Sequence, residues 1–148
     1  MSSISYKDQS IAVVGSRVSQ DKPMKMVVKA GNYEIILDKL GGEAPSPIEY
    51  LLASYAGCIN IVGEIVARDM NIKIHDMKVE ITGVYNPSKL LTGLGERAGY
   101  KEIAVKVSVV SEAGLETLSE WLSRVKERCP IEDNLTRPTL IKSYVEKL

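Results

Sequence analysis

The chain has 148 residues, of which 45% are hydrophobic, and its 19 Lys and Arg residues balance 19 Asp and Glu residues. This length and composition predict one globular domain over residues 1–148. Zero formal net charge and a pI near 6.6 give no basic surface for nucleic acid. Because Glu64 and Arg68 interrupt the longest apolar run, we expect no membrane span either.

The first residues, MSSISYKDQ, lack the basic-then-apolar pattern of a secretion signal. We therefore expect a cytoplasmic protein, in which a pair of cysteines is more often redox-active than structural. A metal site is not expected, because His75 is the only histidine and the sequence has no Cys-x-x-Cys motif.

The opening third of the chain has the pattern of antiparallel strands. Residues 11–18 and 24–37 are rich in Val and Ile, and the polar segment SQDKP separates them. The second run turns again at residues 31–32, Gly-Asn, which suit a tight hairpin. These features predict an antiparallel meander.

A long helix is predicted next. Residues 46–49, Ser-Pro-Ile-Glu, match a capping box with proline at the first helical position. Nothing stops the helix before about Met70, and Asn71 suits a left-handed end. Small residues recur along it every three or four positions: Ala53, Ala56, Gly57, Asn60, Gly63 and Ala67. This stripe indicates either a tight contact in a core or a helix shared between two subunits.

Alternating apolar residues return in the second half of the chain and predict two half-buried antiparallel strands. The apolar positions are Met77, Val79 and Ile81 in the first strand, and Ile103, Val105, Val107 and Val109 in the second. Residues 86–99 lie between them and contain Pro87 and three glycines, which predicts a mobile loop.

An amphipathic helix and a last strand complete the predicted elements. Apolar residues at helical spacing, Leu115, Leu118, Leu122 and Val125, accompany Trp121 and are expected in the core. Pro130 should end this helix. Residues 140–145 then predict a final strand. Strands, a long helix, strands, a helix and a strand together indicate an α+β fold.

The two cysteines lie in contexts suited to chemistry. Cys58 lies among small residues of the long helix, so a substrate or another helix can approach its thiol closely. Cys129 directly precedes Pro130, so its thiol can face free backbone N–H groups, which favour the thiolate. Each thiol also has a structural alternative: Cys58 as a small apolar residue, and Cys129 as half of a permanent disulfide.

These motifs resemble those of the OsmC/Ohr family of thiol peroxidases. The resemblance rests on SPIEYLLASYAGC, ending at Cys58, and CPIEDNL, starting at Cys129, and it covers essentially the whole chain. It implies an OsmC-like fold, with antiparallel sheets packed around a long central helix, in an intertwined homodimer with two active sites at the interface. It also implies reduction of organic hydroperoxides without metal, flavin or haem, and recycling by an external dithiol such as a lipoyl carrier.

The resemblance also implies roles for individual residues. Cys58 is then the peroxidatic nucleophile, which forms a sulfenic acid, and Cys129 resolves that acid to a disulfide. Arg17, in GSRVS, matches the region of the first strands where the family places its active-site arginine. Its guanidinium would stabilise the thiolate and orient the hydroperoxide. An exposed hairpin arginine is the alternative, and Arg97 and Arg128 are the other candidates.

Glu49 departs from the family pattern. Characterised members carry a glutamate ten residues before the peroxidatic cysteine, where this chain has Ile48, and Glu49 lies nine before Cys58. Glu49 would pair with the active-site arginine, although the capping box explains it equally well. On a continuous helix it faces away from Cys58, so a site that uses both needs the partner subunit or a broken helix.

This shifted glutamate keeps a second class of function open. The chain could be an OsmC-like protein that binds a small molecule or handles sulfur without peroxidase turnover. A third possibility is a structural dimer with inert thiols.

Overall fold

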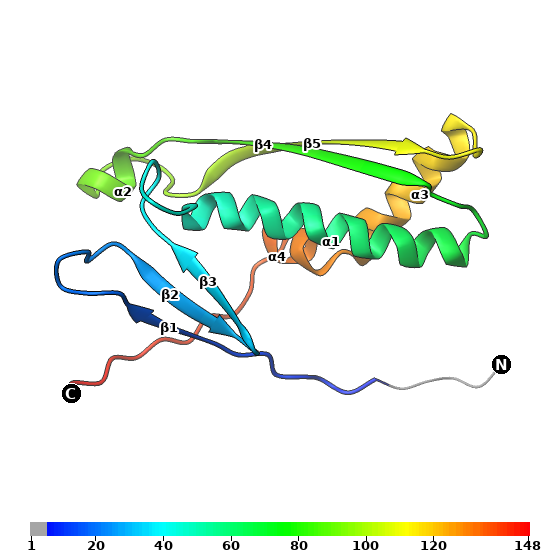
Figure 1. Cartoon of the computed structure of the whole chain (residues 1–148). Helices are drawn as coiled ribbons and strands as arrows, with labels where there is room; N and C mark the ends of the chain where they lie inside the picture. Colours follow the sequence, from blue (N-terminus) through cyan, green and yellow to red (C-terminus); the bar gives the residue numbers. More distant parts are fainter. Residues whose placement is uncertain (1–5) are drawn as a thin grey trace. The chain divides into compact units, whose positions relative to one another are not determined.

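The computed structural model describes residues 6–148, whose elements form two compact units (Figure 1). The first unit ends at Tyr50, and the second runs from Leu51 to Leu148. Residues 1–5, on which the expected lack of a secretion signal partly depends, lie outside the described residues. The expectation of one domain over residues 1–148 stays a prediction.

The first unit is an antiparallel sheet in the order β1-β2-β3. Its strands are β1 (Val13–Arg17), β2 (Met26–Ala30) and β3 (Tyr33–Leu37). Ala30 pairs with Tyr33 across a two-residue turn, in which Gly31 has a φ of 61°. Glycine adopts this left-handed conformation without a steric penalty. The predicted meander is therefore confirmed.

The long helix, α1 (Pro47–Asp69), begins at the predicted capping box. The Ser46 hydroxyl oxygen accepts the backbone N–H of Glu49 at 3.3 Å, and Glu49 Oε1 accepts the backbone N–H of Ser46 at 3.0 Å. Two N–H groups that the helix itself cannot pair are thereby satisfied. Asn71, with a φ of 55°, ends the helix in the predicted left-handed conformation.

By length and composition alone, α1 could cross a membrane. Glu64 and Arg68 were expected to exclude a membrane span, but they do not exclude it on these grounds. One face of α1 is nevertheless buried within the second unit, at positions that include Val62, Val66 and Ala67. A core helix of a globular protein passes the same test of length and composition.

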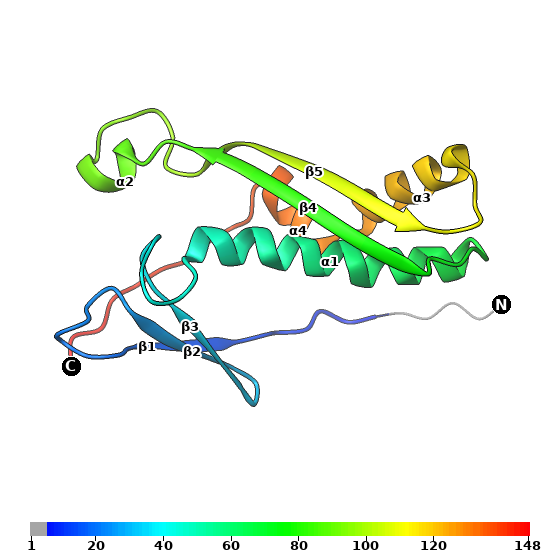
Figure 2. The same ribbon diagram turned by 45° about the horizontal axis from the view of Figure 1, so that its top comes forward.

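In the second unit, β4 (Asp76–Tyr85) and β5 (Tyr100–Val110) form a long antiparallel pair that runs beside α1 (Figure 2). Alternate residues of β4 pack against the core, as predicted. Val105 of β5 was expected on the same buried face but is exposed, because it lines a cavity. The predicted loop between the strands contains a short helix, α2 (Ser88–Thr92), which the sequence did not indicate.

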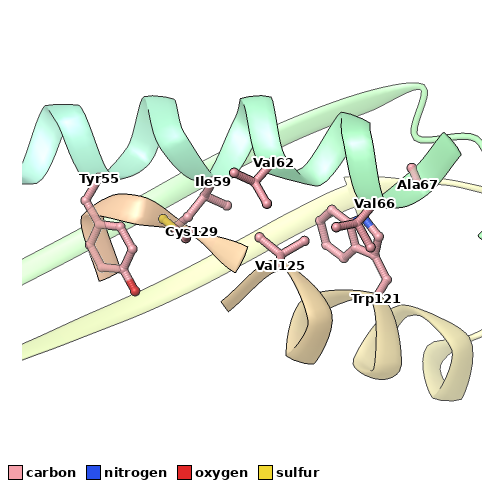
Figure 3. Packing of buried hydrophobic residues seen from close by; sticks show 8 residues of the cluster. All are labelled: Tyr55, Ile59, Val62, Val66, Ala67, Trp121, Val125 and Cys129. Atoms are coloured by element: carbon pink, nitrogen blue, oxygen red, sulfur yellow. The ribbon is translucent and has the colours of Figure 1, made fainter. Parts of the chain in front are cut away.

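The second of the two long helices, α3 (Leu115–Arg128), packs against α1 through Trp121 and Val125 (Figure 3). The indole N–H of Trp121 donates to the carbonyl oxygen of Gly63 at 2.9 Å. Leu115 was predicted in the core but is 83% exposed, because the buried face of α3 begins one turn later. A further short helix, α4 (Pro130–Thr136), follows directly and was not predicted.

The predicted final strand at residues 140–145 is wrong for this chain. The structure has no helix or strand over residues 137–148, and Leu140, Ile141, Tyr144 and Val145 are exposed. A strand needs a neighbour to pair its backbone groups, and no described segment of the chain supplies one here. The α+β class is confirmed, with two antiparallel sheets and a long helix.

Gly63→Ala should lower the free energy of unfolding by about 1–3 kcal/mol, the usual cost of overpacking a core. An added Cβ would lie 2.9 Å from Trp121 Cζ2 and 3.0 Å from Met77 Cε. Urea unfolding followed by the fluorescence of Trp121, the single tryptophan, measures the effect. Gly57→Ala is the matched control, because nothing lies within 4 Å of its added Cβ. Equal stability of Gly63→Ala and Gly57→Ala would show that this contact is not tight, because both variants gain the same helix propensity.

Candidate dithiol site

Tertiary structure brings the two cysteines together. Cys58 lies in the middle of α1, and Cys129 joins α3 to α4. The thiol of Cys129 donates to the sulfur of Cys58, with the two Sγ atoms 3.1 Å apart. Both cysteines are free. A disulfide bond is about 2.05 Å long, so the sulfurs need to move only about 1 Å to form one.

The packing of α3 on α1 explains this proximity. Trp121, Val125 and Cys129 follow one another at intervals of four residues, which places them on one side of α3. Figure 3 shows Trp121 and Val125 directed toward α1, with Cys129 further along the same row. All three belong to one buried cluster with the inward residues of α1. The row therefore ends with the Cys129 sulfur beside Cys58.

Cys129 caps the start of α4, as its position before Pro130 suggested. Its Sγ accepts the backbone N–H of Glu132 at 3.5 Å. Cys129 is only 1% exposed, and this burial raises the pKa of its thiol even though the N–H contact lowers it. The free N–H groups thus favour the thiolate, as expected, but burial of the sulfur outweighs them. Cys58, by contrast, is half-buried.

The sequence analysis missed two residues beside the thiols. The hydroxyl of Tyr55 donates to Oε1 of Glu132. Burial is the main cause that raises the pKa of Tyr55 far above its usual value, and the hydrogen bond to Glu132 adds to it. The hydroxyl therefore stays protonated. Tyr55 lies three residues before Cys58 and Glu132 three after Cys129, a spacing that places each on the same helix face as its cysteine. This three-residue spacing from each cysteine was the feature of the sequence that could have identified Tyr55 and Glu132 as site residues.

A cavity of about 490 Å³ opens beside Cys129. Its apolar lining comes from β5 and from the helices α1, α3 and α4: Tyr55, Ile59, Ile103, Val105, Leu122 and Leu135. Arg97, Lys101 and Lys126 add positive charge to the lining, and Glu102 and Glu132 add negative charge. The cavity could therefore hold an apolar group with a polar or charged end.

The other two predicted site residues belong to the first unit, whereas both thiols belong to the second. Arg17 is the exposed last residue of β1. Glu49 accepts the backbone N–H and the hydroxyl of Ser46, and these hydrogen bonds lower the pKa of its carboxyl group. Because α1 is continuous from Pro47 to Asp69, a broken helix does not bring Glu49 to the face of Cys58.

The two alternative arginines differ in their surroundings. Arg128 forms an ion pair with Asp69, with Nη1 2.6 Å from Oδ2. Arg97 lines the cavity beside Cys129. Among residues 6–148, no group of three His, Cys, Asp or Glu side chains is placed to hold a metal ion.

Sequence comparison identifies one matching family. A family model described as OsmC-like protein matches residues 40–143. This range contains both cysteines, α1 and all the elements of the second unit. No curated protein matches the chain in sequence.

Solved structures show the same fold at low sequence identity. An OsmC-like protein from Mycoplasma pneumoniae is 20% identical with a TM-score of 0.75, over 87% of this chain and 89% of the other. An organic hydroperoxide resistance protein OsmC from Legionella pneumophila is 19% identical with a TM-score of 0.60, over 87% and 92%. The organic hydroperoxide resistance protein OhrB of Bacillus subtilis is 18% identical with a TM-score of 0.56, over 86% and 91%.

Proposed function

We propose that this chain, which belongs to the OsmC-like protein family, is a thiol peroxidase that reduces organic hydroperoxides. Family membership and the similarity in fold to two organic hydroperoxide resistance proteins support this class of substrate. The observation that carries the proposal is the pair of free thiols with sulfurs 3.1 Å apart, of which one is half-buried and the other buried.

Cys58 is the nucleophile in this proposal. Its thiolate attacks one oxygen of the hydroperoxide, the O–O bond breaks, and the products are a Cys58 sulfenic acid and an alcohol. Its greater exposure supports this role, because a peroxide must reach the sulfur.

Cys129 resolves the sulfenic acid. Its sulfur bonds to the sulfur of Cys58, and the sulfenic hydroxyl leaves as water with the Cys129 proton. An external dithiol then reduces the disulfide and is itself oxidised; a lipoyl carrier is the expected type of reductant. Because the cycle needs a reducing compartment, the cytoplasm stays the expected location. The cavity of about 490 Å³ provides room for the organic group of the substrate.

The two cysteine substitutions should have different effects. Cys58→Ser should abolish hydroperoxide consumption in the presence of a dithiol. Cys129→Ser should reduce one equivalent of hydroperoxide and accumulate a sulfenic acid that a dimedone-type probe traps. A variant lacking both cysteines sets the background of the mass-spectrometric measurement. If the wild type retains an organic ligand but consumes no hydroperoxide, the alternative function is favoured: an OsmC-like protein that binds a small molecule without peroxidase turnover.

Arg17 and Glu49 complete the proposed site. The Arg17 guanidinium would stabilise the Cys58 thiolate, and Glu49 would orient the guanidinium. Because Glu49 and Cys58 face opposite sides of one helix, one of these two would come from the partner subunit. A nearby cation lowers the pKa of a thiol because it favours the charged form. Arg97 is the alternative cation, since it lines the cavity beside Cys129.

Arg17→Met should therefore slow the alkylation of Cys58 at neutral pH, by about tenfold or more if the guanidinium is a close partner that favours the charged thiolate. The rate of Cys58 alkylation as a function of pH, measured in a Cys129→Ser background, tests this. Glu49→Gln should have a smaller effect in the same direction, because the guanidinium loses the carboxylate that orients it, while glutamine keeps the capping box. Arg97→Met and Arg128→Met are the matched controls. If only Arg97→Met moves the curve, Arg97 takes the role.

We also propose that the protein is a homodimer. The exposed part of α1 carries Leu51, Ile61 and Ile65, and the C-terminal segment exposes Leu140, Ile141, Tyr144 and Val145. Large exposed apolar groups of this kind mark protein interfaces.

Ile61→Glu should weaken the dimer at least tenfold, because the charge would be buried without a partner at the interface. Ile61 is 63% exposed in the chain, so the folded subunit itself should tolerate the change. Sedimentation equilibrium of the variant and the wild type measures the effect. Ser119→Glu, on the exposed part of α3, adds the same charge as a control. A wild type that sediments as a monomer at micromolar concentration would rule out the dimer.

A further inference from the structure

One hydrogen bond beside the thiols takes no part in either step of this reaction. The Tyr55 hydroxyl donates to Oε1 of Glu132 and so joins α1 directly to α4. Tyr55 is buried and Glu132 is half-buried. Hydrogen bonds to an ionised acceptor are about twice as strong as neutral ones, and partial burial shields this one from competing water.

This contact and the sulfur contact connect the same two segments. Tyr55 and Cys58 lie on one face of α1, and Cys129 and Glu132 lie one turn apart at the start of α4. The backbone N–H of Glu132 also donates to the Cys129 sulfur at 3.5 Å. A displacement of Glu132 is therefore transmitted to the sulfur of Cys129.

The two helices that start with Pro-Ile-Glu use their glutamates differently. Glu49 of α1 accepts the backbone N–H of its own cap residue, Ser46. Glu132 of α4 occupies the equivalent position after its cap residue, Cys129, but accepts a hydrogen bond from Tyr55 of another helix. The carboxylate of Glu132 thus fixes where α4 begins relative to α1.

We propose that Tyr55 and Glu132 are a positioning pair that holds the start of α4 against α1 and keeps the Cys129 sulfur within bonding distance of Cys58. This role rests on the proposed function and refines its second step, in which the Cys129 thiol and the Cys58 sulfenic acid condense to a disulfide and water. The two side chains act through the position of the Cys129 sulfur, so the condensation step should depend on them more than the attack of Cys58 on the hydroperoxide does.

The equilibrium between the dithiol and oxidised glutathione tests the pair without any peroxide. Two protein thiols become one disulfide, and one oxidised glutathione becomes two reduced molecules. Its equilibrium constant grows with the effective concentration of one thiol at the other, which the positioning pair should raise. Tyr55→Phe and Glu132→Ala should each lower this constant about tenfold, which corresponds to about 30 mV in reduction potential. Thiol trapping followed by mass spectrometry measures it.

Three matched variants separate positioning from other effects. Glu132→Gln keeps an oxygen that accepts from Tyr55 in a weaker, neutral hydrogen bond, so its constant should fall by only about threefold. Asp133→Ala removes the neighbouring carboxylate of α4, which pairs with Arg137 on the exposed surface, and should leave the constant unchanged. Tyr50→Phe removes a tyrosine hydroxyl that donates to the Ile36 carbonyl instead, and it too should have no effect.

Rapid mixing with an organic hydroperoxide gives a second readout. In Tyr55→Phe the conversion of the sulfenic acid to the disulfide should slow about tenfold, whereas its formation should slow only as far as the hydroxyl of Tyr55, which lines the cavity, contributes to binding the organic group. General loss of structure would slow both phases and lower the unfolding temperature of Tyr55→Phe, which retains the buried ring.

Two results would overturn the positioning role. One is a glutathione equilibrium in Tyr55→Phe and Glu132→Ala that equals that of the wild type. The other is a Glu132→Gln variant that falls as far as Glu132→Ala, since charge rather than the hydrogen bond would then be decisive. If the wild type consumes no hydroperoxide, the proposed function fails, but the glutathione equilibrium still decides the role of this pair.

Discussion

The contact between Trp121 and Gly63 is the constraint on which the rest of the second unit depends. A side chain at position 63 would lie within 3.0 Å of the indole ring, so glycine is what allows α3 to approach α1 this closely. The hydrogen bond from the indole N–H to the Gly63 carbonyl then fixes how far α3 slides along α1. Val125 and Cys129 follow on the same side of α3. A contact with no chemical role of its own therefore determines where the Cys129 sulfur lies.

The chain uses one helix-start signal twice and obtains a different result each time. Ser46 and Cys129 both precede Pro-Ile-Glu, and both accept the backbone N–H of the glutamate through a side-chain oxygen or sulfur. Serine provides only a cap. Cysteine provides the cap and a thiol, so the redox chemistry proposed for this position depends on one atom, sulfur in place of oxygen.

Burial decides how the two thiols differ. The free N–H groups at the start of α4 favour the thiolate of Cys129, but desolvation of a nearly inaccessible sulfur outweighs them and raises its pKa. The same desolvation contributes to core stability, because Cys129 packs with Trp121 and Val125 as an apolar residue. Packing in the core and the proposed redox role are thus compatible for Cys129, since one packing arrangement serves both.

The sequence by itself determined the features that depend on neighbours along the chain. The capping box at residues 46–49, the left-handed Asn71 and the strand alternation from Met77 to Ile81 are local patterns, and the structure contains each of them. Only the tertiary structure decided what depends on distant partners: the approach of Cys58 to Cys129, the bond from Tyr55 to Glu132 and the pKa of Cys129. Residues 140–145 have the composition of a strand but no described neighbour to pair with. Periodicity reports which face a residue occupies, whereas proximity, burial and strand pairing depend on what the fold places opposite that face.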